Sequence, residues 1–203
     1  MSTACYGVNI HNALNEDDPA FIGEKAVRKL IEGFSCPPNA EVEHFLKRNA
    51  IEFTKKNQSV TYLVFQPTAK EEIFVGYFTL AVKPVSIRAS VLSRTMEKKL
   101  LRVSTLNREN GTYTASAYLI AQLGKNFSLP PEKRISGTAL LGLADMTVKM
   151  ARHIVGGVVE FLECEDTPFL LDFYARNGFK AFDRRTAASE DGEEELVQLL
   201  RFI

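Results

Sequence analysis

The second half of the chain alternates between segments whose apolar residues recur every second position and segments whose apolar residues recur every three or four. This pattern predicts strands over residues 117–125, 157–164, 179–182 and 195–203, and helices over residues 137–153 and 168–177. Strands that alternate with helices are typical of an α/β fold. The acidic run around residue 191 is expected to form a solvated turn between the last two strands.

The first half begins with a weaker pattern. Residues 5–14 are compatible with an edge strand, and residues 23–34 with a short amphipathic helix that places Val27, Leu30 and Ile31 on one face. After two prolines, Asn39 is placed to cap a further helix. The apolar residues of that helix follow helical spacing: Val42, Phe45, Leu46, Ala50 and Phe53.

Two β-rich runs follow and predict an antiparallel hairpin. They extend from Ser59 to Gln66 and from Glu72 to Val82, and the loop between them contains Pro67. Residues 83–116 then interrupt the strand pattern with a helical stretch, Ser93 to Val103, and with a turn at Asn110-Gly111. We interpret residues 83–116 as an insertion into the sheet pattern.

Length and composition favour one globular domain. The 203 residues can bury a single large core, and 45% hydrophobic with 25% charged residues is average for such proteins. Equal numbers of basic and acidic residues, 25 each, argue against a chain-wide footprint for nucleic acid or an anionic membrane. Any such partner must use a local patch. Seven cations accompany Glu97 as the one anion in a basic block: Lys83, Arg88, Arg94, Lys98, Lys99, Arg102 and Arg108.

Cysteine and histidine spacing gives no metal site. The three cysteines (Cys5, Cys36 and Cys164) and the three histidines (His11, His44 and His153) are far apart and lack ligand or triad spacing. No segment approaches the ~18 apolar residues of a membrane span, and the N-terminus lacks a signal-peptide pattern. We therefore expect a cytoplasmic protein without a metal and without membrane contact.

The join between the strand ending at Lys125 and the helix opening at Ser136 is a candidate anion site. The first N–H groups of a helix lack partners and carry the positive end of the helix dipole. Lys133 and Arg134 add charge there, and Gly137 lets a phosphate approach the backbone. The alternative is that Ser136 is an ordinary N-cap and Gly137 a packing residue.

A second candidate is the helix over residues 168–177. Thr167 can cap it with Pro168 in its first position, and Gly178 is suited to end it. Tyr174 lies on this helix just before a short strand. A buried tyrosine usually needs a partner for its hydroxyl, and core packing explains Tyr174 as well as chemistry does.

The order of these segments resembles the GNAT superfamily of acyl-CoA-dependent N-acyltransferases from about residue 34 to the C-terminus. Arg134 to Ala139 (R-I-S-G-T-A) fits the loop formula Q/R-x-x-G-x-G/A of that superfamily, and Phe173 to Phe179 (F-Y-A-R-N-G-F) fits F-Y-x-x-x-G-F. The resemblance implies one domain over 1–203 with a central, mixed and mostly antiparallel sheet. This sheet would have six to seven strands flanked by helices, with the basic helical insertion between the third and fourth strands.

The resemblance also implies site residues. Acetyl-CoA would be the co-substrate, and Tyr174 would protonate its thiolate leaving group. The residues implied to bind acetyl-CoA are Leu123, Gly124 and Lys125 for the pantetheine arm, Lys133, Arg134, Ile135, Ser136, Gly137 and Thr138 for the pyrophosphate, and Phe173. The strand before the loop contains no carboxylate, so a lysine-like amine would need water or Glu163 or Glu165 as base, whereas an α-amine needs little help.

Residues 34–53 resemble the opening segment of a bacterial GNAT subgroup that includes the toxins of toxin–antitoxin pairs. Three hypotheses stay open: a working N-acetyltransferase, a CoA-binding module without turnover, and a toxin that acetylates the amino acid on charged tRNA. An antitoxin or a second copy of the chain would then be a partner. The basic block fits a tRNA platform, a grip on the CoA 3′-phosphate or a solvated helix face.

Overall fold

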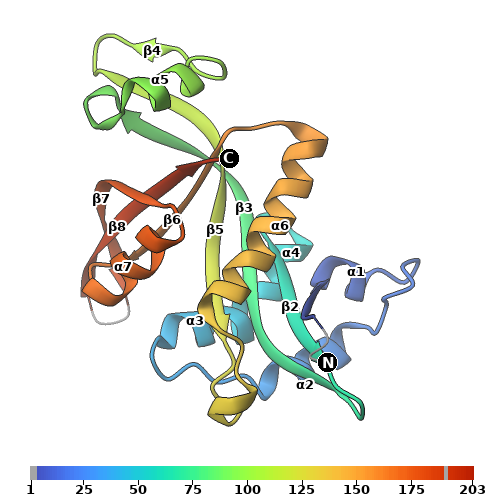
Figure 1. Ribbon diagram of the computed structural model, residues 1–203. Coiled ribbons are helices and arrows are strands. Elements are labelled where there is room, and N and C mark those ends of the chain that lie inside the picture. Colours follow the sequence, from blue (N-terminus) through green and yellow to red (C-terminus); the bar gives the residue numbers. More distant parts are fainter. Residues whose placement is uncertain (1–3, 190–191) are drawn as a thin grey trace. The chain divides into compact units, whose positions relative to one another are not determined.

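The computed structural model describes residues 4–189 and 192–203 (Figure 1). The chain divides into two compact units, and long elements run through both. The first unit comprises the described part of Met1–Ala81 together with Ile120–Thr147, and the second comprises Val82–Leu119 with the described part of Val148–Ile203. Each unit has its own buried apolar cluster, described in turn below.

Eight strands form one sheet in the order β1-β2-β3-β5-β6-β8-β7, with β4 paired to β5. The strands are β1 (Tyr6–Asn9), β2 (Val60–Pro67), β3 (Glu72–Arg88), β4 (Leu106–Asn107), β5 (Thr112–Lys125), β6 (Val159–Glu165), β7 (Lys180–Ser189) and β8 (Gly192–Phe202). The β5–β6 pair is parallel, over Tyr118–Glu160 and Leu119–Phe161, and the pairs β1–β2, β2–β3, β4–β5, β6–β8 and β7–β8 are antiparallel. The expected mixed, mostly antiparallel sheet flanked by helices is confirmed, and the strand beyond the expected six to seven is the two-residue β4.

Several helices of the first unit precede the β2–β3 hairpin. They are α1 (Ile10–Leu14), α2 (Glu24–Glu32), α3 (Ala40–His44), a π-helical turn (Phe45–Asn49) and α4 (Ala50–Lys55). Asn39 caps α3 as predicted, because its side-chain oxygen accepts the N–H of Val42 at 2.9 Å. The core of this unit is built around fully buried Ile10, Phe34, Leu46 and Tyr77.

Two predicted core positions of this unit are wrong. Leu30 and Phe53 are each 38% exposed. On α2 only the narrow stripe of Val27 and Ile31 meets the core. At Phe53 the reason is the π-helical turn, since its wider i→i+5 spacing rotates the following residues and turns Ile51 and Thr54 inward instead.

The second unit holds α5 (Arg94–Leu100), α7 (Pro168–Arg176) and the strands around them. Its core includes Ile87, Leu100, Tyr113 and Leu200. Strand β3 continues to Arg88 and β5 already begins at Thr112, so the part outside these long strands is residues 89–111. Strands β7 and β8 are also longer than 179–182 and 195–203. The expected turn between them falls on residues 190 and 191, which lie outside the described residues.

Helix α6 (Gly137–Val155) follows β5 and begins in the first unit. Its buried positions Leu140, Leu141, Ala144 and Val148 follow the predicted helical spacing. Over residues 4–189 and 192–203, no helix has the length and apolar character that a bilayer crossing needs.

Candidate functional site

Four consecutive backbone N–H groups have no hydrogen-bond acceptor among the described residues where β5 leads into α6. The amides of residues 135–138 donate to no group in the described part of the chain. Hydrogen bonds occupy the amides on both sides, those of Lys133 and Arg134 in a 3₁₀ turn and those of Ala139 and Leu140, which donate to Ser136. The open amides stand at the N-terminus of a 19-residue helix, where the helix dipole favours an anion.

Ser136 and Gly137 occupy the first turn as the sequence predicted. The Ser136 hydroxyl accepts the N–H of Ala139 at 3.1 Å, so Ser136 is an N-cap, and Gly137 is the first residue of the helix. The N-cap interpretation and the anion-site interpretation are compatible. Capping engages the amide of Ala139, and the four preceding amides still have no acceptor among the described residues. Thr138 is exposed, whereas the Ile135 side chain is buried and anchors the loop.

Arg134 braces this loop with its side chain. Its Nε donates to the carbonyl of Leu129 at 2.7 Å and its Nη2 to that of Phe127 at 3.1 Å, while the guanidinium lies 5.0 Å from the centre of the Phe127 ring. The guanidinium is thus engaged with the loop that carries the amides. Lys133 is exposed and supplies positive charge beside them.

The end of β5 packs closely on β3 through two glycines. A Cβ on Gly124 would lie 2.6 Å from atoms of Tyr77 and Val42, and a Cβ on Gly76 would lie 2.6 Å from the Gly124 carbonyl oxygen. Beyond them, Asn126 fixes the strand end, since its backbone N–H and its side-chain amide donate to backbone carbonyls of β3, both at 2.9 Å. Leu123 and Lys125 are half-buried, and the Lys125 ammonium lies 5.2 Å from the centre of the Phe127 ring.

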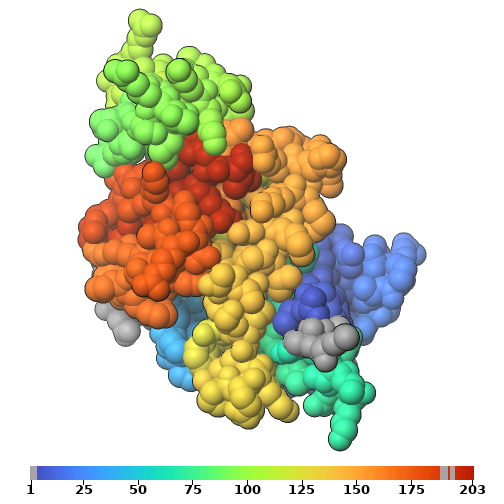
Figure 2. Space-filling view, viewed as in Figure 1, coloured from blue at the N-terminus to red at the C-terminus, as the bar shows by residue number. Residues whose placement is uncertain are grey.

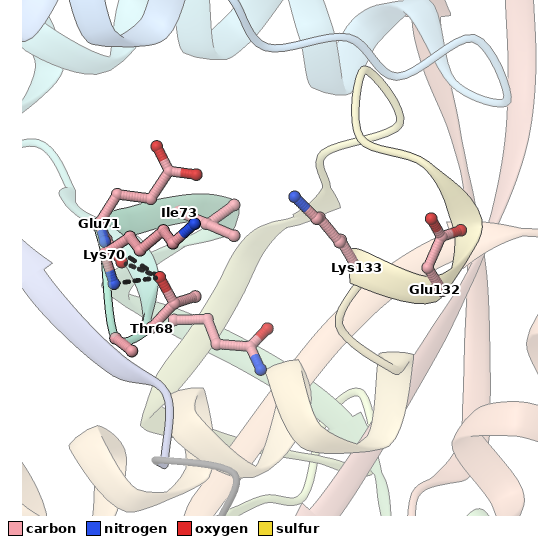
Figure 3. A pocket seen from close by; sticks show the side chains of 8 residues that line it. Thr68, Lys70, Glu71, Ile73, Glu132 and Lys133 are labelled. Carbon is pink, nitrogen blue, oxygen red and sulfur yellow. Dashed lines mark hydrogen bonds between the residues drawn. The ribbon is translucent and has the colours of Figure 1, made fainter.

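A cavity of about 390 Å³ lies between the tip of the β2–β3 hairpin and the 3₁₀ turn before α6 (Figure 3). Its lining residues are Gln66, Thr68, Ala69, Lys70, Glu71, Ile73, Glu132 and Lys133. The hairpin wall is held by Thr68, whose N–H and hydroxyl both donate to the Glu71 carbonyl, at 2.8 and 2.7 Å. The lining contains two lysines and two glutamates, so the cavity has no net preference for an anion.

In the second unit, Tyr174 is buried on α7 among aromatic rings. Its ring centre lies 5.0 Å from that of Phe173 and 5.9 Å from that of Phe179, both in edge-to-face geometry. The hydroxyl bonds to no described residue, although Tyr174 is only 8% exposed. Burial, followed by the nearby Cys164 thiol, raises the pKa of Tyr174 above its usual value of 10.0. The hydroxyl therefore stays protonated at neutral pH.

The turn after α7 fixes the direction of this helix. Thr167 caps the start as predicted, with its hydroxyl accepting the N–H of Leu170, and Gly178 (φ +85°) ends it in the left-handed conformation that glycine allows. The amides of Asn177 and Phe179 both donate to the Tyr174 carbonyl, at 3.1 and 3.0 Å. The tyrosine is therefore held by its own backbone at the last turn of the helix.

A buried ion pair that the sequence patterns did not predict supports the same turn. Glu160 on β6 is fully buried and accepts from Nε and Nη2 of Arg201 at 2.7 and 2.6 Å. Nη1 of Arg201 donates to the Asn177 carbonyl at 3.1 Å, and the guanidinium lies 4.3 Å from the Phe179 ring centre. One arginine thus joins β6, β8 and the end of α7. A carboxylate inside an apolar strand is the signal that could have revealed this pair.

The other reactive side chains near β6 are occupied or unreactive. Burial acts to raise the pKa of Glu163, but hydrogen bonds from Arg185 and Gln198 outweigh it and hold that pKa below 4.5. Glu163 is therefore a weak base. Burial, with Glu165 and Asp166, raises the pKa of the Cys164 thiol to about 11, which disfavours the nucleophilic thiolate. No cluster of described side chains could hold a metal ion.

The comparisons with known proteins agree with this fold. No family model and no curated protein sequence matches the chain. Its fold is the GNAT fold found in toxins of toxin–antitoxin systems, so the predicted resemblance is confirmed at the level of the fold.

The chain is similar to the toxins KacT and AtaT. A tyrosine-to-phenylalanine mutant of KacT is 18% identical, covers 98% of this chain and 95% of its own, and superimposes with a TM-score of 0.62. AtaT in complex with acetyl-methionyl-tRNAfMet is 18% identical (82% of this chain, 85% of its own, TM-score 0.57). A mutant of AtaT bound to the C-terminus of the antitoxin AtaR and acetyl-CoA is 18% identical (83% and 82%, TM-score 0.54). At these identities the likeness shows the fold alone.

Proposed function

We propose that the protein is an acetyl-CoA-dependent N-acetyltransferase that transfers the acetyl group directly to an amine acceptor. The observation that carries this proposal is the row of open amides at residues 135–138, at the start of a long helix in a GNAT fold. Such a row suits the pyrophosphate of acetyl-CoA, because each N–H can donate to a phosphate oxygen and the helix dipole favours its charge.

The side chains around the loop fit this co-substrate. Lys133 is free to pair with a phosphate, and Arg134 and Ile135 keep the loop in place from within. The backbone of Leu123, Gly124 and Lys125 would hydrogen-bond the pantetheine arm, and Phe173 would contact it through its ring. A phosphate at Gly137 would approach the backbone without meeting a Cβ.

The reaction requires one bond to form and one to break. The neutral amine attacks the acetyl carbon, the C–N bond forms, and the C–S bond of the thioester breaks. Tyr174 donates its hydroxyl proton to the departing sulfur, and the proton released by the nitrogen returns through water to the Tyr174 oxygen, which restores the hydroxyl. The raised pKa of Tyr174 keeps this proton in place across the neutral range.

The acceptor that fits best is an α-amine. Glu163 is engaged by Arg185 and Gln198 and its pKa is lowered, so it would not efficiently deprotonate a lysine-like amine with a pKa of ~10.4. An α-amine titrates near ~7.7–8.0 and is substantially neutral without a base. Small amino compounds, protein N-termini and aminoacyl-tRNA all provide such a group.

The second candidate function is a toxin that acetylates the α-amine of aminoacyl-tRNA and is paired with an antitoxin. It is favoured by the similarity to AtaT in complex with acetyl-methionyl-tRNAfMet and with the antitoxin AtaR. A CoA-binding module without turnover is the third candidate. The unpartnered hydroxyl of Tyr174 favours the two enzymes over this module.

Calorimetry followed by a transfer assay tests the proposal. We expect the purified protein to bind acetyl-CoA, and to bind free CoA less tightly if the acetyl group itself is recognised. Radiolabelled acetyl-CoA should then label bulk charged tRNA or members of a panel of free amines. Absence of binding at millimolar acetyl-CoA would refute the proposal. Binding of acetyl-CoA without transfer to any acceptor would instead identify the protein as a CoA-binding module without turnover.

A further inference from the structure

The two residues that hold the backbone of Tyr174 are the same two that Arg201 contacts. The N–H groups of Asn177 and Phe179 donate to the Tyr174 carbonyl at 3.1 and 3.0 Å. Nη1 of Arg201 donates to the carbonyl of Asn177 at 3.1 Å, and the guanidinium lies 4.3 Å from the centre of the Phe179 ring. The Phe179 ring in turn packs edge-to-face on the ring of Tyr174, with 5.9 Å between their centres. Arg201 is therefore linked to Tyr174 through the backbone and through a ring.

Glu160 fixes the direction of the Arg201 side chain. One carboxylate oxygen of Glu160 accepts from Nε and Nη2 of Arg201, so Nη1 is the nitrogen that meets the end of the helix. Two hydrogen bonds from adjacent nitrogens hold a planar guanidinium in one orientation, which a lysine ammonium cannot reproduce. The orange to red surface in Figure 2 covers this part of the second unit, and Glu160 contributes no exposed area to it.

Stability alone does not explain a charged pair at this position. Taking two charges out of water costs free energy that their attraction only partly repays, and apolar residues of similar volume often fold as stably. The neighbours of Glu160 on β6 show what the core holds elsewhere, since Val159, Phe161 and Leu162 are buried and apolar. An apolar pair could fill the same space, but it could not donate a hydrogen bond to the backbone at the end of α7.

We propose that Arg201, oriented by Glu160, is a positioning residue for Tyr174 in acetyl transfer. It holds the turn after α7, and with that turn the direction in which the Tyr174 hydroxyl meets the departing sulfur. A general acid acts only within hydrogen-bond reach of the atom that it protonates, so a small displacement of the helix end should lower the rate strongly. The proposal rests on the proposed function, because it assigns to the pair a role in the transfer step.

The experiment replaces both members of the pair, because removal of one alone would leave a buried charge and destabilise the fold. The test variant combines Glu160→Leu with Arg201→Met, which keeps a similar volume and removes the hydrogen bond to the helix end. The control combines Asp172→Asn with Arg176→Gln, which removes an exposed ion pair on the same helix. We expect melting temperatures close to wild type for both. If the test variant does not fold, Arg201→Lys replaces it, since lysine keeps the charge beside Glu160 without the planar group.

Transfer kinetics show whether the effect passes through Tyr174. With the acceptor that the transfer assay identifies, we expect the test variant to lose ~10–100-fold in kcat with an unchanged KM for acetyl-CoA, and the control to match the wild type. In a Tyr174→Phe background the same replacement should cost little more, because an effect that acts through the hydroxyl disappears with it. Equal losses in the two backgrounds would overturn the proposal, as would wild-type kcat in the folded test variant.

A second readout follows the ring of Tyr174 without turnover. The chain has six tyrosines, so labelling with fluorotyrosine gives a small set of fluorine NMR resonances, and Tyr174→Phe identifies the resonance of Tyr174. We expect this resonance to broaden or split in the test variant, because the ring then samples several positions, and to stay single in the control. A single resonance at the wild-type position in the test variant would refute the positioning role.

The two readouts separate this proposal from the proposed function. Wild-type protein that transfers acetyl to no acceptor would refute the proposed function, and the fluorine spectra would still decide whether Arg201 fixes the ring of Tyr174. Wild-type protein that transfers acetyl, together with a test variant of unchanged kcat and unchanged fluorine spectrum, would refute the positioning role and leave the acetyltransferase.

Discussion

The loop before α6 and the end of α7 carry their candidate chemistry in different ways. The loop offers four backbone amides, and its side chains mainly hold the backbone in place, as Arg134 and Ile135 do. The end of α7 offers one side-chain hydroxyl, that of Tyr174, held by a turn and a buried ion pair. Pyrophosphate binding by the loop amides should therefore tolerate most changes of exposed side chains. Proton donation by Tyr174 should instead be lost when its hydroxyl oxygen is removed.

The largest effect is expected at Tyr174. Tyr174→Phe removes the hydroxyl and keeps the ring contacts with Phe173 and Phe179, so kcat should fall by ~10²–10⁴-fold while the melting temperature changes little. Because the pKa of Tyr174 is raised, loss of wild-type activity through its ionisation should occur only above about pH 10. A steady-state pH profile of the wild type and the variant measures the fall in kcat and the pH at which wild-type activity is lost. Tyr62→Phe, in strand β2, is the control, and wild-type kcat in Tyr174→Phe would contradict the acid role.

The next effect is expected at the buried ion pair. Glu160→Ala leaves the Arg201 guanidinium without its carboxylate in a buried position, which should reduce the free energy of unfolding by about 3–5 kcal/mol. Denaturant titration measures the loss. The exposed pair Arg176–Asp172 on α7 offers a control, because Asp172→Ala should cost about 0–1 kcal/mol. Equal effects of the two substitutions would show that the buried pair does not fix the end of α7.

A smaller effect is expected in the loop. Gly137→Val places a β-branched side chain beside the open amides and should cost ~1.5–3 kcal/mol of acetyl-CoA binding, about 10–100-fold in affinity, without changing the fold. Gly142→Val is the matched control in the same helix, because a Cβ at Gly142 would meet open space. Calorimetry on both variants is the measurement. Equal affinities would place the pyrophosphate elsewhere.

The smallest effect concerns pH. The pKa of Glu163 is lower in the folded protein than its ordinary 4.5, so its pairing with Arg185 contributes stability that is present above that value and is lost as the pH falls through the lowered pKa. Since Arg185 is partly exposed, we expect at most ~1 kcal/mol. Glu163→Gln should flatten the dependence of unfolding free energy on pH below 4.5. An unchanged slope in that variant would assign the acid sensitivity to other groups.

Much of the fold could be predicted from the spacing of apolar residues and from helix-capping residues. The hairpin of β2 and β3, the cap at Asn39 and the start of α6 follow from local patterns that the tertiary structure leaves intact. The exposure of Phe53 could not be predicted from the sequence. The π-helical turn before it changes which side of the helix Phe53 lies on, while the apolar spacing still fits a regular α-helix. Strand ends were also underestimated, since β3 continues to Arg88, with buried Val85 and Ile87 alternating with exposed residues.

The candidate site could be predicted in part from the sequence. The positions of Ser136, Gly137 and Tyr174 follow from their helix-terminal patterns. The engagement of the Arg134 guanidinium with the loop could not be predicted, because both of its acceptors are backbone carbonyls, which every residue has. The partner of Glu160 is 41 residues away on another strand, and a distant side-chain pair leaves no local periodicity.

The outer strands of the sheet have a consequence for aggregation. Strand β1 at one end is only four residues long, and strand β7 at the other carries Lys180, Asp183, Arg184 and Arg185. Short or charged edges resist pairing with an edge of another molecule, because a neighbouring chain would find few free backbone groups or would desolvate charge. Continuous sheets between copies are thus disfavoured at both ends, which protects the protein from amyloid-like growth at high concentration.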